Sequence, residues 1–185
     1  MQSNASLVAS YARAHAAYTL STKTDGWSLD MEAPVRDAKG AALLTALVKA
    51  VSDAVHIALP SAQVTFSSDI LGFESTVDQF DLVGISKHVD KLLVMCYEAA
   101  KNVSAPEFQK ANMPLPMLQS GVATYVERGV PAAKLILAFP WFGFSWKCSV
   151  TANRTECDPA RDPLGRGVHC EMRYAPLLCL LLCVC

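Results

Sequence analysis

The stretch DGWSLDME, residues 25–32, decides the fold and carries the clearest chemistry in this chain of 185 residues. In a β-strand, successive side chains point to opposite faces, so Ser28, Asp30 and Glu32 share one face while the apolar residues alternate with them. Glu32 stands directly before Ala33-Pro34, a pair that ends a strand. The stretch therefore predicts a strand with one polar and one apolar face, and two acids near its carboxyl end.

Helices and strands are expected to alternate around this stretch. Helical spacing of apolar residues predicts helices over residues 7–20, 41–59 and 116–128. In the second of these, Leu43, Leu44, Leu47, Val48, Val51, Val55 and Leu59 are expected on one face. Short apolar or β-rich runs predict parallel strands over residues 63–70, 91–97 and 134–141. With right-handed crossovers, the alternation predicts an α/β fold with a parallel sheet, either open or part of a closed barrel.

Two carboxylates on one strand face need a reason, because charge inside such a sheet is costly. Catalytic residues of β/α barrels lie at the carboxyl ends of strands, where Glu32 is expected. Repulsion between neighbouring acids and partial burial both favour the protonated form that a general acid needs. Glu32 is the natural acid, and the alternative is an exposed edge strand whose acids only face water.

Composition and charge exclude some functions. The chain is 52% hydrophobic with a net charge of -1, and its basic residues form no run interleaved with aromatics, so nucleic acid is not expected as a partner. The start of the chain lacks a secretory signal pattern. The apolar end at residues 177–185, LLCLLLCVC, is shorter than the ~20 residues of a membrane-spanning helix. We expect no membrane partner, and we treat this end as non-native to a domain over residues 1–176.

Cysteines and glycosylation sequons suggest an oxidising compartment. Cys148, Cys157 and Cys170 fall in one polar, turn-rich stretch and are disulfide candidates, with Cys148–Cys157 the first choice. Zinc is the alternative, but the spacing lacks short ligand pairs, so no metal is expected. Cys96 lies in an apolar run and is expected to be a buried thiol. The sequons begin at Asn4, Asn102 and Asn153.

The octet resembles the DGxxxDxE core of glycoside hydrolase family 18, particularly its chitobiase branch. Three further segments resemble that family in the same order: residues 64–66 (VTF), 94–97 (VMCY) and 139–143 (FPWFG). The resemblance implies a (β/α)8 TIM-barrel type of fold, incomplete here, with about four βα units that correspond to strands four to seven. It also implies a lysosomal or extracellular location, no cofactor, and an oligosaccharide containing N-acetylglucosamine as the binding partner.

The same resemblance implies roles for single residues. Glu32 would protonate the glycosidic oxygen, Asp30 would orient the 2-acetamido group that attacks the anomeric carbon, and Tyr97 would hydrogen-bond the acetamido oxygen. Further residues are expected near the sugar or to support the site: Asp25, Ser28, Met95, Glu98 and Trp141. Of these, Asp25 more readily braces the start of the strand, and Met95 is expected to share a strand face with Tyr97. The alternative for Trp141 is a place in the core.

Departures from the family pattern qualify these roles. Ser28 replaces a commoner Asp, which leaves Asp30 to depend on the serine hydroxyl or on water. Glu98 replaces the usual Asp after the tyrosine, and Phe142 stands where chitinases often carry Tyr. Because a complete barrel takes about 250 residues, weak or no activity is expected of this chain alone. Two alternatives stay open: a non-catalytic chitin-binding protein and a non-functional gene-model fragment.

Overall fold

The computed structural model describes residues 2–32, 35, 37–70, 80–98, 112–147 and 171–176. It divides the chain into two compact units, which are described separately. The first unit comprises residues 1–95 and 119–138, and the second comprises residues 96–118 and 139–185. The prediction of one partial catalytic domain over residues 1–176 stays a prediction.

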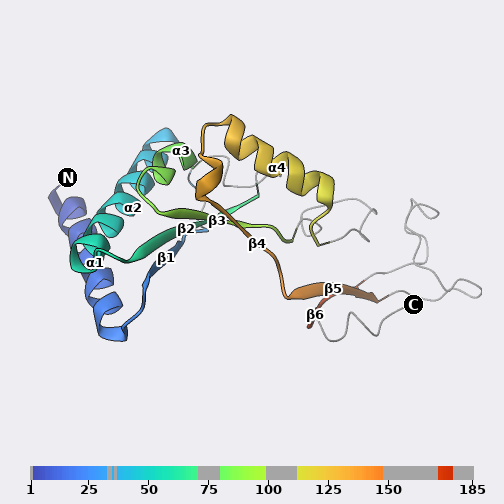
Figure 1. Cartoon of the computed structure of the whole chain (residues 1–185), viewed down its shortest axis with the longest axis horizontal. Coiled ribbons are helices and arrows are strands. Elements are labelled where there is room, and N and C mark those ends of the chain that lie inside the picture. The colour runs from blue at the N-terminus through green and yellow to red at the C-terminus, as the bar shows by residue number, and fades with distance from the viewer. Residues whose placement is uncertain are drawn as a thin grey trace, which may run out of the picture. The chain divides into compact units, whose positions relative to one another are not determined.

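The first unit is built on a four-stranded parallel sheet, as predicted. Its strands are β1 (Gly26–Asp30), β2 (Gln63–Asp69), β3 (Lys91–Met95) and β4 (Leu135–Ala138), which pair in the order β1-β2-β3-β4 (Figure 1). The register pairs Asp30 with Ser67, and Met95 with both Asp69 and Ala138. The carboxyl ends of all four strands therefore lie at one edge of the sheet.

The two central strands form the core of this sheet. Val64 and Phe66 of β2 and Leu92 and Val94 of β3 are all 0% exposed. These residues alternate along each strand and pair in register, so they lie on one face of the sheet. The Phe66 ring also makes an edge contact with Phe80, with 5.9 Å between the ring centroids. Burial of these side chains supplies much of the free energy that holds the sheet together.

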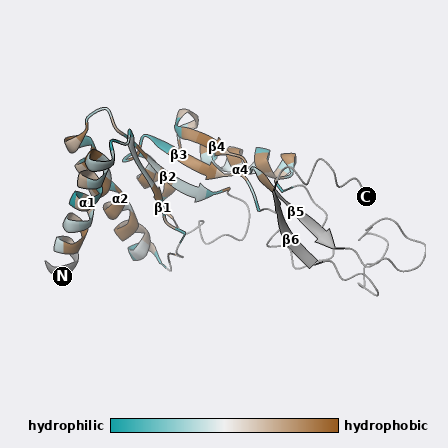
Figure 2. Cartoon of the chain, turned by 90° about the horizontal axis from the view of Figure 1, so that it is seen from below, coloured by the Kyte–Doolittle hydropathy of each residue, from teal (hydrophilic) through white to brown (hydrophobic). Residues whose placement is uncertain are grey.

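The helices α1 (Gln2–Thr22) and α2 (Ala38–Ala58) pack against each other and against β1. Both were predicted, and both are longer than expected. The Asp37 carboxylate caps α2 by accepting a hydrogen bond from the Gly40 N–H at 2.8 Å. Leu44, Val48, Val51 and Val55 form its buried stripe, but the expectation for Leu43 was wrong, because its side chain is 58% exposed. Figure 2 shows how apolar α2 is.

The length and composition of α2 alone would allow it to cross a membrane. This is weak evidence, because the core helix of a soluble protein passes the same test. In the structure, one stripe of α2 is buried against α1 and the sheet, and the opposite side of the helix is exposed.

The helix α4 (Leu115–Glu127) precedes β4 and was also predicted. It ends before Gly129, whose φ of 100° suits a residue without a side chain. Tyr125 is 0% exposed, and its hydroxyl donates a hydrogen bond to the Asp69 carbonyl at 2.5 Å and lies 2.6 Å from the Ser68 hydroxyl. The short helix α3 (Leu82–Ser86) and the 3-10 turn η2 (Ala132–Lys134) were not predicted.

The second unit contains an antiparallel pair, β5 (Phe142–Lys147) and β6 (Glu171–Pro176). Neither strand was predicted. The strand expected over residues 134–141 is shorter, because β4 ends at Ala138 and Lys134 belongs to η2. Cys148, Cys157 and Cys170 lie outside the described residues, so their disulfide pairing stays a prediction, as does the non-native end at residues 177–185.

Candidate active site

The strand β1 presents its side chains as the sequence predicts. Leu29 is buried at 3% exposure, whereas Ser28 and Asp30 on the other face are exposed. The Thr65 hydroxyl on β2 donates a hydrogen bond to the Ser28 hydroxyl at 2.9 Å. Apolar contacts on one face thus fix the orientation of the strand, and Asp30 points away from them.

The carboxyl end of β1 differs from the expectation in two ways. The strand ends at Asp30, so Glu32 lies two residues beyond it rather than at its last position. Both acids are exposed, and the expected partial burial is wrong for the part of the chain that the structure describes. Within the described residues, the four strands form an open sheet rather than a closed barrel, so these side chains face solvent. Their position beside the carboxyl ends of parallel strands agrees with the prediction.

The start of β1 explains the first two residues of the octet. The Asp25 carbonyl accepts a hydrogen bond from the Gln63 N–H at 2.9 Å, which begins the pairing of β1 with β2. The Asp25 side chain itself is exposed. A Cβ atom on Gly26 would lie 1.9 Å from the Gln63 carbonyl oxygen. Only glycine therefore allows the two backbones to approach this closely.

The end of β3 places Met95 in the core, at 7% exposure, at the same edge of the sheet as Asp30. Cys96, which follows it, is 0% exposed, as predicted. Because β3 ends at Met95, Tyr97 lies beyond the strand, and the expectation that the two share a strand face was wrong. The division into two units falls after Met95, so Tyr97 belongs to the second unit.

In the second unit, Tyr97, Glu98, Asn112 and Phe142 form one cluster. The rings of Tyr97 and Phe142 meet edge to face, with 5.8 Å between centroids and an interplanar angle of 71°. The Glu98 N–H donates to the Asn112 Oδ1 at 2.6 Å, and the Asn112 Nδ2 donates to the Phe142 carbonyl at 3.1 Å. Asn112 was not predicted as a site residue, because no hydrophobic periodicity or motif marks this position in the sequence.

Trp141 is 85% exposed in the second unit, so its alternative role as a core aromatic is wrong. Glycosylation at Asn4, Asn102 and Asn153 stays a prediction: the Asn4 backbone lies in α1, and Asn102 and Asn153 lie outside the described residues.

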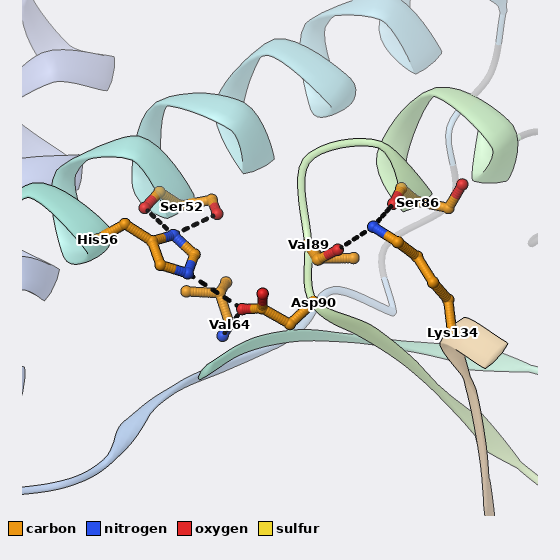
Figure 3. Close-up of polar contacts among 7 residues, drawn as sticks. All are labelled: Ser52, His56, Val64, Ser86, Val89, Asp90 and Lys134. Atoms are coloured by element: carbon orange, nitrogen blue, oxygen red, sulfur yellow. Dashed lines mark hydrogen bonds and ion pairs between the residues drawn. The ribbon is translucent and has the colours of Figure 1, made fainter. Parts of the chain in front are cut away.

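A second polar cluster lies at the opposite, amino-terminal edge of the sheet (Figure 3). One Asp90 carboxylate oxygen lies 3.1 Å from the His56 Nε2 and accepts the Val64 N–H at 2.7 Å. The Lys134 ammonium donates to the carbonyls of Ser86 and Val89 at 2.6 and 2.7 Å. Polar groups at this edge of such sheets contribute to stability. None of these contacts was predicted from the sequence.

This second cluster includes a serine, a histidine and an aspartate, Ser52, His56 and Asp90, but they are not arranged as a catalytic triad. Ser52 is 2% exposed, and the His56 Nδ1 lies 2.9 Å from the backbone carbonyl of Ser52 as well as 3.2 Å from its hydroxyl. The burial of Ser52 and the contact of the His56 ring with a backbone carbonyl are those of residues that stabilise the packing of α2. Across the described residues, no three His, Cys, Asp or Glu side chains gather in a way that could hold a metal ion.

Comparisons with known proteins agree on one family. The model of the glycosyl hydrolases family 18 matches residues 1–172. The chain is 29% identical over 155 residues to di-N-acetylchitobiase from Homo sapiens, a match that covers 80% of this chain and 38% of that protein. The chain thus spans well under half the length of this curated relative.

Two solved structures support the fold. A chitinase-like agglutinin from Robinia pseudoacacia has a TM-score of 0.68 at 17% identity, over 89% of this chain and 50% of that one. A plant class V chitinase mutant from Cycas revoluta, in complex with (GlcNAc)3, has a TM-score of 0.57 at 22% identity, over 69% of this chain and 40% of that one. The predicted fold class, α/β of the TIM-barrel type and incomplete, is confirmed.

Proposed function

The chain belongs to the glycosyl hydrolases family 18. From this premise we propose that it carries the general acid, Glu32, and the neighbouring Asp30 of a retaining glycosidase site. The proposed substrates are β-1,4 N-acetylglucosamine linkages of chitobiose, of a chitooligosaccharide or of the core of an N-glycan. The name of the human relative and the (GlcNAc)3 bound to the Cycas revoluta chitinase support this class of sugar.

The observation that carries the proposal is the orientation of β1. Buried Leu29 fixes the strand, so that Asp30 is presented on the other face and Glu32 follows at the carboxyl edge of a parallel sheet. This is the edge at which catalytic residues of β/α barrels lie.

The proposed reaction is substrate-assisted. Glu32 donates a proton to the glycosidic oxygen as the bond to the anomeric carbon breaks, and the carbonyl oxygen of the 2-acetamido group attacks that carbon. Asp30 orients the acetamido N–H and stabilises the oxazolinium ion that forms, and Tyr97 hydrogen-bonds the acetamido oxygen. Glu32 then takes a proton from water, which attacks from the face the leaving group occupied, so configuration is retained.

Glu32→Gln tests the role of the acid. The variant removes the proton and little volume, so we expect it to lose whatever turnover of a chromogenic chitobioside the 185-residue chain shows, while binding of GlcNAc trimer changes less than about twofold. Asp53→Asn is the matched control, because this exposed carboxylate lies on α2, pairs with Lys49 and should leave turnover unchanged. Undiminished turnover in Glu32→Gln would refute the assignment.

The amount of activity is a separate prediction. The described sheet has four strands and leaves both acids exposed, so we expect weak or no turnover from this chain compared with an intact family member. The measurement is the kcat/KM of the purified chain on the same chitobioside. A value close to that of an intact relative would contradict the prediction.

A non-catalytic, sugar-binding role is the second candidate, favoured by the exposure of Asp30 and Glu32. GlcNAc-thiazoline, whose ring copies the oxazolinium ion, separates the two. In a catalytic site the Asp30 carboxylate contacts the ring nitrogen of the thiazoline, so Asp30→Asn should weaken binding of the thiazoline. In a lectin-like site the same variant should leave binding of the thiazoline and of GlcNAc trimer unchanged. We further propose a lysosomal or extracellular location, supported by the sequons, the cysteines and the family.

A further inference from the structure

Asn112 joins two segments of the second unit through both ends of its side-chain amide. Its Oδ1 accepts the Glu98 N–H at 2.6 Å, and its Nδ2 donates to the Phe142 carbonyl at 3.1 Å. The partners fix the orientation of the amide, because a backbone N–H requires the oxygen and a carbonyl requires the nitrogen. The side chain is half-buried, so these bonds are partly shielded from water.

One of the two partners has an unusual backbone conformation. Glu98 has a φ of 60°, in the left-handed region that residues other than glycine rarely adopt. Such conformations persist only where surrounding contacts hold them, and they concentrate at functional sites. The bond from Asn112 holds the amide group of Glu98, which is the peptide directly after Tyr97. It therefore fixes the direction in which the chain leaves Tyr97.

The other partner contacts Tyr97 directly. The Phe142 ring meets the Tyr97 ring edge to face at 5.8 Å, and the Asn112 Nδ2 holds the backbone of this phenylalanine. Asn112 thus acts on Tyr97 from two sides, through the peptide that follows it and through the ring beside it. All four residues belong to the same compact unit.

We propose that Asn112 is a positioning residue that holds the Tyr97 side chain in place for binding the acetamido oxygen of the sugar. The sugar-binding part of this inference rests on the function proposed above. The positioning part depends only on the cluster of four residues. Two experiments on the 185-residue chain test the parts separately.

The first experiment measures the cluster by NMR. Asn112→Ala removes both bonds, so the amide exchange of Glu98 should accelerate about tenfold and the contact between the Tyr97 and Phe142 rings should disappear. Asn112→Asp keeps an oxygen that accepts the Glu98 N–H, but it replaces the N–H donor to the Phe142 carbonyl by a carboxylate oxygen. It should keep the slow exchange of Glu98 and lose only the ring contact.

Asp37→Ala is the matched control, because it also removes a side-chain acceptor from a backbone N–H, at the start of α2 in the first unit. It should leave Glu98 and the ring contact unchanged. Slow Glu98 exchange and an intact ring contact in Asn112→Ala would overturn the proposal. If Asn112→Ala does not fold, Asn112→Asp decides, since an intact ring contact in that variant would equally overturn it.

The second experiment measures binding of GlcNAc trimer by calorimetry. Asn112→Ala and Tyr97→Phe should each weaken binding about tenfold, and the double variant should bind no more weakly than Tyr97→Phe alone. Fully additive losses, or unchanged binding in Asn112→Ala beside a loss in Tyr97→Phe, would overturn the link to the sugar. If the unaltered chain binds no trimer, the proposed function fails, while the NMR result still decides whether Asn112 positions Tyr97.

Discussion

Single residues at the amino-terminal edge of the sheet connect α2, β2 and β3. Asp90, directly before β3, accepts the Val64 N–H and lies beside the His56 ring at the end of α2. The Asp90 side chain is 39% exposed, so solvent screens its charge and the hydrogen bonds provide most of its contribution. The short side chain of Asp90 thus ties three elements together.

Replacing Asp90 tests this connection. Asp90→Ala leaves the Val64 N–H and the His56 ring without their acceptor, and should lower the free energy of unfolding by roughly 1 to 2 kcal/mol. Urea denaturation followed by circular dichroism measures the change. Asp53→Ala is the control, because it breaks only the exposed pair of Asp53 with Lys49 and should cost less than about 0.5 kcal/mol. Equal losses in the two variants would contradict this role for Asp90.

At the same scale, the sequence predicted some site residues better than others. Alternation along β1 was sufficient to place Leu29 and Asp30 on opposite faces of the strand, because the period of a strand is fixed by its geometry. It did not predict that Asp30 is exposed, since partial burial was expected there. Asn112 could not be found in this way, since its role depends on Glu98 and Phe142, which lie 14 and 30 positions away in the chain. Contacts across such separations are set by the fold and leave no local pattern.

At the scale of elements, α2 shows how periodicity predicts a helix but not the width of its buried stripe. The sequence placed Leu43 and Leu44 on the same face, yet the structure buries Leu44 and leaves Leu43 58% exposed. The stripe is narrower than the run of apolar residues, because α1 and the sheet cover only one side of the helix.

A pair of variants in α2 tests the width of the stripe. Val51 is 0% exposed, so Val51→Ala should lower the free energy of unfolding by roughly 2 kcal/mol through lost burial and a cavity. Leu43→Ala removes a larger but exposed side chain and should cost less than about 0.5 kcal/mol. Chemical denaturation of both variants under the same conditions is the measurement. A larger loss in Leu43→Ala would show that Leu43 is covered in solution.

Short elements were harder to predict than long ones. The helix α3 has five residues, fewer than two turns, so its apolar residues cannot establish a period. Its start depends instead on Asp81, whose carboxylate accepts the Gly84 N–H at 2.8 Å. The strands β5 and β6 pair across a long separation in sequence, and neither contains a turn signal that would join them.

At the scale of the whole molecule, the parallel sheet ends in two edges. Within the described residues, β1 pairs only with β2, and β4 pairs only with β3. On β4, Ile136 and Leu137 are 39% and 36% exposed. An apolar edge with unpaired backbone groups is a template for pairing with another chain.

The edge strand leads to a prediction about self-association. The purified chain should associate with increasing concentration, and Ile136→Lys should shift it towards the monomer, because a charge on an edge strand opposes pairing. Sedimentation velocity over a range of concentrations measures the distribution. Ile57→Lys is the control, since Ile57 is 83% exposed on α2, away from the edge, and should leave the distribution unchanged. If both variants shift towards the monomer to the same extent, the edge strand β4 is not responsible for self-association.

The order of the strands bears on how the chain folds while it is being synthesised. Each strand of the sheet pairs with the strand that precedes it, so the order of pairing is the order in which the ribosome releases them. A nascent chain that has emerged as far as Met95 contains the residues of α1, α2 and the three strands β1, β2 and β3, which pair in sequence order in the folded chain. Tyr125 emerges later and closes onto Asp69 of β2, a contact that fastens α4 to a sheet already formed.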